Sequence, residues 1–200
     1  MFPFFESMAL IGGKIRNLSF HQSRINRTFG RFYPGYTPHE IQNINFDIQD
    51  NPIQIYKVKL SYNLLDYLIQ ITPYETKSIA GVMPISQPEL NYSYKYTDRE
   101  ILNFLKNKFP ENVEILIIKN GKICDTSIHN IILNKNNKWF TPSEPLLNGT
   151  MRQFLLYEKK ITECEIYLNN LGEYKNFKLI NALNSFDDSQ TLPIELIKSN

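Results

Sequence analysis

The N-terminal part of the chain alternates apolar and polar positions in short stretches, a pattern that predicts strands around one helix. An apolar run over residues 2–10, the turn Gly12-Gly13 and residues 14–18 predict two paired strands. Ser19 is a favoured helix-capping residue, so we predict a helix over residues 20–31. Further alternating stretches predict strands over residues 53–62, within 63–73 and within 74–89.

The C-terminal part predicts strands joined by tight turns. Val113–Ile118 is an apolar run with β-branched residues, and Asn120-Gly121 favours a type I′ turn. A returning strand is predicted over Lys122–Leu133, and a third strand over Trp139–Thr141 stops at Pro142. A good helical pattern covers residues 153–160. Further patterns predict a helix over 100–108, strands over 161–168 and 177–183, a turn or short helix over 169–174 and a last short element over 192–197.

These elements predict a mixed α/β protein of the α+β type. Two hundred residues with 42% hydrophobic content suffice for one substantial core or two small lobes. Proline and polar residues cluster at residues 84–89, which is typical of a boundary between lobes. We therefore predict an N-terminal lobe over residues 1–86 and a C-terminal lobe over residues 87–200.

Charge and cysteine content argue against several classes of function. The 22 basic and 20 acidic residues give a net charge of +2, and the basic residues form no run, which argues against nucleic acid or a membrane surface as the main partner. The two cysteines, Cys124 and Cys164, are too few for a disulfide framework and lack metal-ligand spacing, so we expect no metal site. No apolar run reaches the roughly 18 residues of a membrane span. We expect a soluble, cytoplasmic protein in which Cys124 is an inert buried thiol.

The segment Asn148-Gly149-Thr150 carries the first candidate chemistry, because it stands at the start of the predicted C-terminal helix. The unpaired N–H groups and the dipole of such a helix start can bind a phosphate. In the simpler interpretation Asn148 or Thr150 is an ordinary N-cap.

Lys95 and Asp125 favour the phosphate-binding interpretation of this helix start over the ordinary N-cap. Lys95 is flanked by Tyr94 and Tyr96, and Asp125 lies in the predicted hairpin. Each also has a purely structural interpretation: Lys95 could extend over a sheet edge, and Asp125 could be a turn residue. Together with a phosphate-binding helix start, however, an amine and a carboxylate are what a protein needs to hold pyridoxal 5′-phosphate.

Four segments in this order resemble the class IV aminotransferase family of pyridoxal-phosphate enzymes. They are YSYKYTDR, KICDTSIHNI, KWFTPSEPLLNGTMR and LINAL, within residues 92–183. Upstream, Phe5-Glu6-Ser7 and His21-Gln22-Ser23-Arg24 stand where the family tends to have an F-E-T-like strand and an H-x-x-R element. The family contains branched-chain aminotransferases, D-amino acid aminotransferase and 4-amino-4-deoxychorismate lyase.

The resemblance implies the two-lobed fold type IV, with a small N-terminal α/β lobe and a larger, mostly antiparallel C-terminal β lobe with helices. It also implies a role for Arg24. From the residues alone, Arg24 can be interpreted as a solvated charge on the predicted helix, and His21 as a packed residue. The implied site consists of Lys95 as the catalytic lysine bonded to pyridoxal phosphate, Asp125 at its pyridine nitrogen, and Arg24, Gly149, Thr150, Met151 and Asn181 around its phosphate.

Departures from the family pattern bear on the reaction. Asp125 stands where most relatives have glutamate, and the chain is shorter than typical members. Glu100 replaces a tyrosine of the branched-chain enzymes, whereas residues 148–154, NGTMRQF, are close to the form of the lyase branch.

Three hypotheses follow. The first is 4-amino-4-deoxychorismate lyase, the second is an aminotransferase for branched-chain or other small amino acids, and the third is a shortened, non-catalytic member. For the enzymes the resemblance implies a small-molecule amine substrate and a homodimer.

Overall fold

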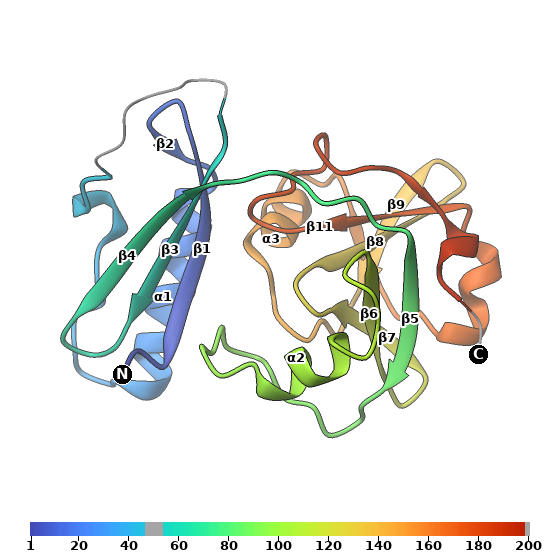
Figure 1. Ribbon diagram of the computed structural model, residues 1–200, viewed down its shortest axis with the longest axis horizontal. Coiled ribbons are helices and arrows are strands. Elements are labelled where there is room, and N and C mark those ends of the chain that lie inside the picture. The colour runs from blue at the N-terminus through green and yellow to red at the C-terminus, as the bar shows by residue number, and fades with distance from the viewer. Residues whose placement is uncertain (47–53, 199–200) are drawn as a thin grey trace. The chain divides into compact units, whose positions relative to one another are not determined.

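The computed structural model describes residues 1–46 and 54–198, and the chain forms two compact units (Figure 1). Unit 1 comprises Met1–Glu75 and Tyr94–Asp98, and unit 2 comprises Thr76–Ser93 and Arg99–Asn200. The division differs from the lobe boundary predicted between residues 86 and 87. The reason is strand pairing, since residues 81–86 pair with a strand of unit 2, whereas residues of 94–98 hydrogen-bond to the first strand of unit 1.

Unit 1 is an antiparallel sheet with one long helix. Its elements are β1 Phe4–Ile11, β2 Lys14–Ile15, α1 Leu18–Phe32, the 3₁₀ helix η1 Ile41–Asn43, β3 Tyr56–Tyr62 and β4 Tyr67–Pro73. The strand order is β2-β1-β3-β4, and α1 lies along one face of the sheet (Figure 1). Met8, Phe29 and Leu60 are almost fully buried in the core of this unit, so β1, α1 and β3 together exclude water.

Unit 2 is built on a larger sheet with two short helices. Its elements are β5 Gly81–Ser86, α2 Glu100–Lys106, β6 Val113–Lys119, β7 Lys122–Thr126, β8 Asn130–Lys135, β9 Lys138–Pro142, α3 Thr150–Tyr157, β10 Thr162–Cys164, the 3₁₀ helix η2 Leu168–Glu173, β11 Asn176–Ile180, β12 Leu192–Pro193 and the 3₁₀ helix η3 Ile194–Leu196. The strand order is β10-β9-β8-β7-β6-β5, with β11 paired to β8 and β12 to β11. Only the pairs β5–β6 and β9–β10 are parallel among these strands of the described chain, so the sheet is mostly antiparallel as expected.

The start of α1 corrects the predicted cap at Ser19. The helix begins at Leu18, after Asn17, whose φ of 55° is left-handed. The carbonyl of Asn17 accepts hydrogen bonds from the N–H groups of Phe20 and His21. A side-chain cap is a local preference, and here the short β1–β2 turn delivers the chain to the helix before Ser19 is reached.

The predicted strand over Lys122–Leu133 is wrong in one respect, because it is two strands with a turn between them. Thr126 N–H donates to the His129 carbonyl at 2.9 Å, and His129 N–H donates to Thr126 Oγ1 at 2.9 Å. The type I′ turn expected at Asn120-Gly121 is supported by left-handed φ values of 51° and 79°.

Three further predicted strands differ in extent, and one aromatic segment forms no strand. The strand predicted over 161–168 ends at Cys164, and the aromatic stretch around Lys95 forms only an isolated bridge between Phe4 and Tyr96 among the described residues. The strand predicted within 74–89 is β5, which contains Pro84; an edge strand tolerates proline because one of its sides needs no hydrogen-bond donors. The predicted strand 53–62 is observed from Tyr56, and residue 53 lies outside the described residues.

Two absences concern possible partners. Over residues 1–46 and 54–198, none of the helices combines the length and the apolar character that crossing a membrane requires. In the same part of the chain, histidine, cysteine, aspartate and glutamate side chains form no group of three that could hold a metal ion.

Candidate functional site

The predicted site residues fall into two groups, one in each unit. Lys95 and Arg24 belong to unit 1, and Asp125 belongs to unit 2 together with the residues predicted to surround the phosphate from α3 and β11. Each group is described within its own unit.

Lys95 is held against β1 by its backbone. The N–H of Phe5 donates to the Lys95 carbonyl at 3.1 Å, and the N–H of Thr97 donates to the Pro3 carbonyl at 2.8 Å. The half-buried Lys95 side chain places Nζ 4.7 Å from the centre of the Phe5 ring. Because an aromatic face attracts a cation, this contact orients the Lys95 amine.

A buried charged cluster, Glu6-His21-Arg24, lies between β1 and α1. Arg24 Nε donates to Glu6 Oε1 at 2.7 Å, Arg24 Nη2 donates to Oε2, and His21 Nδ1 lies 2.6 Å from Oε2. The side chains of Glu6 and His21 are fully buried, and Arg24 is 4% exposed. The interpretation of Arg24 as a solvated helix charge is therefore wrong, whereas a packed and hydrogen-bonded His21 is confirmed.

The cluster fixes the charge of its members. Burial alone would raise the pKa of Glu6, but the charge of Arg24 and the hydrogen bonds from Arg24 and His21 outweigh it and hold that pKa at about 2. Burial lowers the pKa of His21, and the charges of Arg24 and Lys95 lower it further. A neutral His21 facing a carboxylate must donate from Nδ1, so the cluster is an ionised Glu6 between a cation and a neutral donor.

Alternation along β1 separates the two candidate groups of unit 1. Phe5 and Glu6 are neighbours in a strand and so point to opposite faces of the sheet. The Lys95 amine contacts Phe5, whose side chain lies on one face of the sheet. The Arg24 guanidinium contacts Glu6, whose side chain lies on the other face. Both charges still act on His21. The predicted phosphate role of Arg24 stays a prediction.

Asp125 is a buried carboxylate in β7. Its Oδ1 accepts a hydrogen bond from Asn130 Nδ2 at 2.8 Å, and its Oδ2 accepts one from the N–H of Leu147 at 2.8 Å. Burial raises the pKa of Asp125 to about 6, although these hydrogen bonds and the charge of Arg152 oppose the rise. A buried carboxylate attracts a cation, and a bound cation would lower the pKa of Asp125 again.

At the start of α3, the backbone lies close to the side chain of Asn130. Its N-cap residue is Gly149, and a Cβ atom built there would lie 2.0 Å from Asn130 Oδ1. Thr150 and Met151 open the first turn and are 2% exposed. Asn148 does not act as the predicted side-chain cap, because its Oδ1 accepts a hydrogen bond from Arg152 Nη1 at 3.0 Å.

Arg152 anchors the loop before α3. Its Nη2 donates to the Pro142 carbonyl at 2.9 Å and to Glu163 Oε1 at 2.5 Å, while Nη1 binds Asn148. The side chain is 2% exposed. One buried cation thus joins the end of β9, the loop and the helix, and so fixes the direction in which the first N–H groups of α3 point.

Asn181 follows β11 and organises a turn. Its Oδ1 accepts hydrogen bonds from the N–H groups of Leu183 and Asn184, both at 2.9 Å, and its Nδ2 donates to the Ile128 carbonyl at 3.3 Å. The side chain therefore shapes the backbone of the turn, and the predicted phosphate role of Asn181 stays a prediction.

The residues of unit 2 fit a pyridine ring with a phosphate. Asp125 supplies a buried acceptor for the pyridine nitrogen, and the start of α3, where Gly149 leaves room for the Asn130 amide, supplies backbone N–H groups for a phosphate. Asp125, the start of α3 and Asn181 also lie close together, because β7 and β11 both pair with β8. Which of them contact the group stays a prediction.

Sequence reasoning missed Glu6, Asn130 and Arg152 as parts of this framework. Glu6 had a signal, namely an acidic residue among apolar residues in a predicted strand. Asn130 and Arg152 act through partners 4 to 17 residues away, and nothing in their local pattern indicates those partners.

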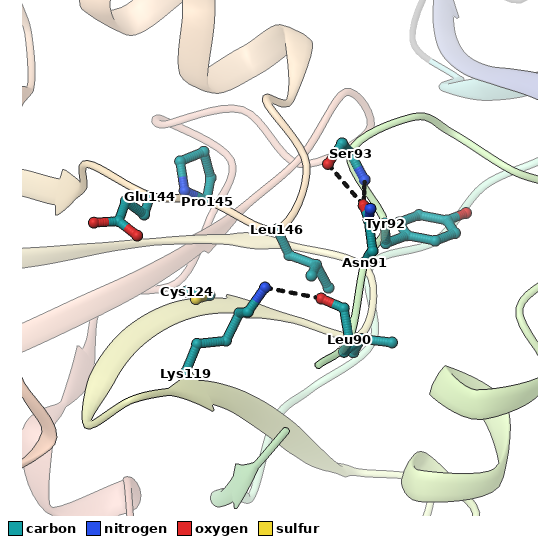
Figure 2. A pocket seen from close by; sticks show the side chains of 9 residues that line it. All are labelled: Leu90, Asn91, Tyr92, Ser93, Lys119, Cys124, Glu144, Pro145 and Leu146. Atoms are coloured by element: carbon teal, nitrogen blue, oxygen red, sulfur yellow. Dashed lines mark hydrogen bonds between the residues drawn. The ribbon is translucent and has the colours of Figure 1, made fainter. Parts of the chain in front are cut away.

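A cavity of about 160 Å³ also lies in unit 2 (Figure 2). Lys119 Nζ donates across it to the Leu90 carbonyl at 3.0 Å. Cys124 lines the cavity, and Asp125 points to the opposite face of β7 because side chains alternate along a strand. Burial raises the pKa of Cys124 to about 11, so the prediction of an inert thiol is supported.

Comparisons with known proteins relate these features to a family. The sequence pattern of the amino-transferase class IV family matches residues 102–186. An uncharacterized protein of Haemophilus influenzae is 37% identical over 187 residues, covering 92% of this chain and 99% of that protein. The crystal structure of a protein from Haemophilus somnus 129PT, provisionally named 4-amino-4-deoxychorismate lyase, matches with a TM-score of 0.86 at 36% identity, covering 93% of this chain and 98% of that one. A hypothetical aminotransferase of Mycobacterium tuberculosis in its PLP-bound form has a TM-score of 0.69 at 9% identity, covering 98% of this chain and 84% of that one, which is a likeness of fold.

Proposed function

Because the chain belongs to the class IV aminotransferase family, a family of pyridoxal-phosphate enzymes, we propose that it is a 4-amino-4-deoxychorismate lyase that uses this cofactor. The fold of that family, fold type IV, is shared by the chain. The observation that carries the choice of lyase is the match, over 98% of its length, to the Haemophilus somnus structure. The NGTMRQF form of residues 148–154 supports the same choice.

Each candidate residue has a stated task in this proposal. Arg24 and the N–H groups of Thr150 and Met151, the two residues that follow Gly149, would hold the phosphate, with the Asn181 turn beside them. Asp125 would hold a proton on the pyridine nitrogen. The cofactor, when bound, supplies an electron sink for the carbon that carries the substrate amine.

Lys95 would carry the proton transfers. Its Nζ would take the proton from the amine-bearing carbon, the bond between the ring carbon and the oxygen of the enolpyruvyl group would break, and a proton would return to the released group to give pyruvate. The two products, 4-aminobenzoate and pyruvate, contain all the atoms of the substrate. No second reactant is therefore needed, in contrast to a transamination.

The test is pyruvate release from 4-amino-4-deoxychorismate by the purified protein supplied with pyridoxal phosphate, with no keto acid present. We expect stoichiometric pyruvate and 4-aminobenzoate, and loss of both with Lys95→Ala. Consumption of an amine substrate only after a keto acid is added would instead identify an aminotransferase for branched-chain or other small amino acids. A protein that does not retain the cofactor would be a non-catalytic family member.

The setting of the enzyme belongs to the same proposal. We place it in the cytoplasm, where its product would serve folate synthesis, and we propose a homodimer as implied by the family resemblance. The free thiols Cys124 and Cys164 are compatible with a reducing compartment.

A further inference from the structure

Asn130 occupies the central position among the predicted cofactor-binding elements of unit 2. It opens β8, lies opposite Asp125 in the β7–β8 pair, and lies opposite Ile180 in the β8–β11 pair. Ile180 directly precedes Asn181. At 6% exposure, the Asn130 side chain is buried among these elements.

The amide of Asn130 makes two hydrogen bonds that join separate elements. Nδ2 donates to Asp125 Oδ1 at 2.8 Å and to the Leu147 carbonyl at 2.9 Å, which uses both of its N–H groups. The N–H of Leu147 in turn donates to Asp125 Oδ2 at 2.8 Å. Three hydrogen bonds therefore close a ring that fixes the plane of the carboxylate.

The other end of the same amide meets the start of α3. A Cβ atom at position 149 would lie 2.0 Å from Asn130 Oδ1 and 3.1 Å from Cγ, so glycine is the residue that leaves room for the amide. Asn130 thus spans the distance from the Asp125 carboxylate to the N-cap of the helix predicted to bind phosphate.

We infer that Asn130 is a positioning residue that holds the Asp125 carboxylate and the start of α3 in one fixed arrangement for the pyridine nitrogen and the phosphate. The inference rests on the proposed use of pyridoxal phosphate. Asn130 acts through Asp125, Leu147 and Gly149, and no contact of its own with the cofactor is required. Aspartate at this position could not replace it, because an ionised carboxylate has no N–H to donate and would repel Asp125.

The experiment compares the affinity for pyridoxal phosphate with that for 1-deaza-pyridoxal phosphate, an analogue that lacks the ring nitrogen. Both dissociation constants are measured by titration for the wild type, Asp125→Asn, Asn130→Ala and Asn130→Asp. Asn134→Ala, which changes the same residue type in the same strand, is the matched control. Thermal midpoints of the cofactor-free proteins report on folding.

We expect Asn130→Ala to weaken pyridoxal phosphate binding by about ten- to a hundredfold, the range for losing a hydrogen bond to a charged group. The preference of the wild type for pyridoxal phosphate over the deaza analogue should fall toward that of Asp125→Asn. Asn130→Asp conserves volume, so it should retain the fold and still lose this preference. Asn134→Ala should match the wild type.

Other outcomes have distinct meanings. A wild type that binds neither compound would refute the proposed function and this inference with it. A wild type that prefers pyridoxal phosphate, with the same preference in both Asn130 variants, would overturn the inference and leave the function standing. Equal weakening of both compounds together with a lowered thermal midpoint would show that Asn130 only stabilises the fold, and would also overturn it.

Discussion

At the scale of single residues, two buried carboxylates are held in different electrostatic states. Glu6 faces the guanidinium of Arg24 directly, and its pKa is held at about 2. Asp125 receives hydrogen bonds from neutral donors and forms no ion pair among the described residues, and burial raises its pKa to about 6. Glu6 is therefore a structural charge that already has its partner, whereas Asp125 is suited to receive a cation that arrives with a ligand.

The pKa of Asp125 leads to an expected pH dependence of cofactor binding. Only the ionised carboxylate attracts a protonated pyridine nitrogen, so the affinity should fall as the pH decreases through about 6. Asp125→Asn should lack this step and keep any step that comes from the phosphate. Dissociation constants for pyridoxal phosphate measured from about pH 5 to about pH 8 test this. Identical pH profiles for the two proteins would contradict the role of Asp125.

Glu6→Gln should destabilise the protein strongly, because it leaves the Arg24 guanidinium buried without its counter-charge. Removing one partner of a buried pair costs about 3–5 kcal/mol. The pKa of Glu6 is lowered from 4.5 to about 2, so its stabilisation is complete above the unfolded value and is lost as the pH falls toward 2. The difference from the wild type should therefore narrow in acid.

Urea unfolding near neutral pH and in acid measures both parts of this expectation. Glu144→Gln, at the exposed pair with Lys122, is the control and should leave the midpoint unchanged. A midpoint for Glu6→Gln as high as that of the control would show that the cluster is not stabilising.

At the scale of elements, the ends of strands could be predicted where they depend on local chemistry. They could not be predicted where they depend on partners distant in the sequence. Asn120-Gly121 specifies its turn through its own backbone preferences. The break between β7 and β8 instead depends on Thr126 and on a hydrogen bond from Ser127 to Glu114 of β6 at 2.7 Å. No glycine or proline marks this break, so the sequence alone predicts one strand.

The same distinction applies to the candidate site. Lys95, Asp125 and the start of α3 can be proposed because their residue types and order match a known chemistry, and their roles stay predictions. Asn130 and Glu6 contribute through pairing across strands and between a strand and a helix, which one sequence does not reveal. The structure therefore adds the residues that hold the predicted groups in place.

Gly149→Ala tests the close approach at the start of α3. The backbone of Gly149, with φ −68° and ψ 149°, suits any residue, so the cost is the clash of the new Cβ with Asn130 alone. We expect displacement of the amide, a lower thermal midpoint and about tenfold or more weaker pyridoxal phosphate binding, as for loss of a hydrogen bond to a charged group. Gly172→Ala, where nothing lies within 4 Å of the added Cβ, should change neither quantity. If both variants bind like the wild type, the contact with Asn130 is dispensable.

At the scale of the whole molecule, each unit has its own core and its own part of the proposed chemistry. Unit 1 carries the amine of Lys95 and the guanidinium of Arg24, and unit 2 carries the carboxylate of Asp125 and the start of α3. The proposed function thus draws on groups from both units, and the similarity to the Haemophilus influenzae protein extends over 92% of the chain.

The proposed homodimer has a direct physical test. Light scattering of the purified protein should give about twice the chain mass of 23.5 kDa. Ile101 and Phe104 of α2, which are 57% and 63% exposed, are apolar side chains that a second copy could cover. A mass of one chain across the micromolar range would contradict the dimer and leave the assignment of family unchanged.

The central claim is that Lys95 forms the covalent link to pyridoxal phosphate, and one spectrum tests it most directly. The purified protein is incubated with the cofactor, freed of excess, and its visible absorption is recorded beside that of Lys95→Ala. We expect the wild type to show the band of lysine-bound pyridoxal phosphate, and borohydride reduction to fix the cofactor on the peptide that contains residue 95. A variant that keeps the same band, or a wild type that shows none, would contradict the claim.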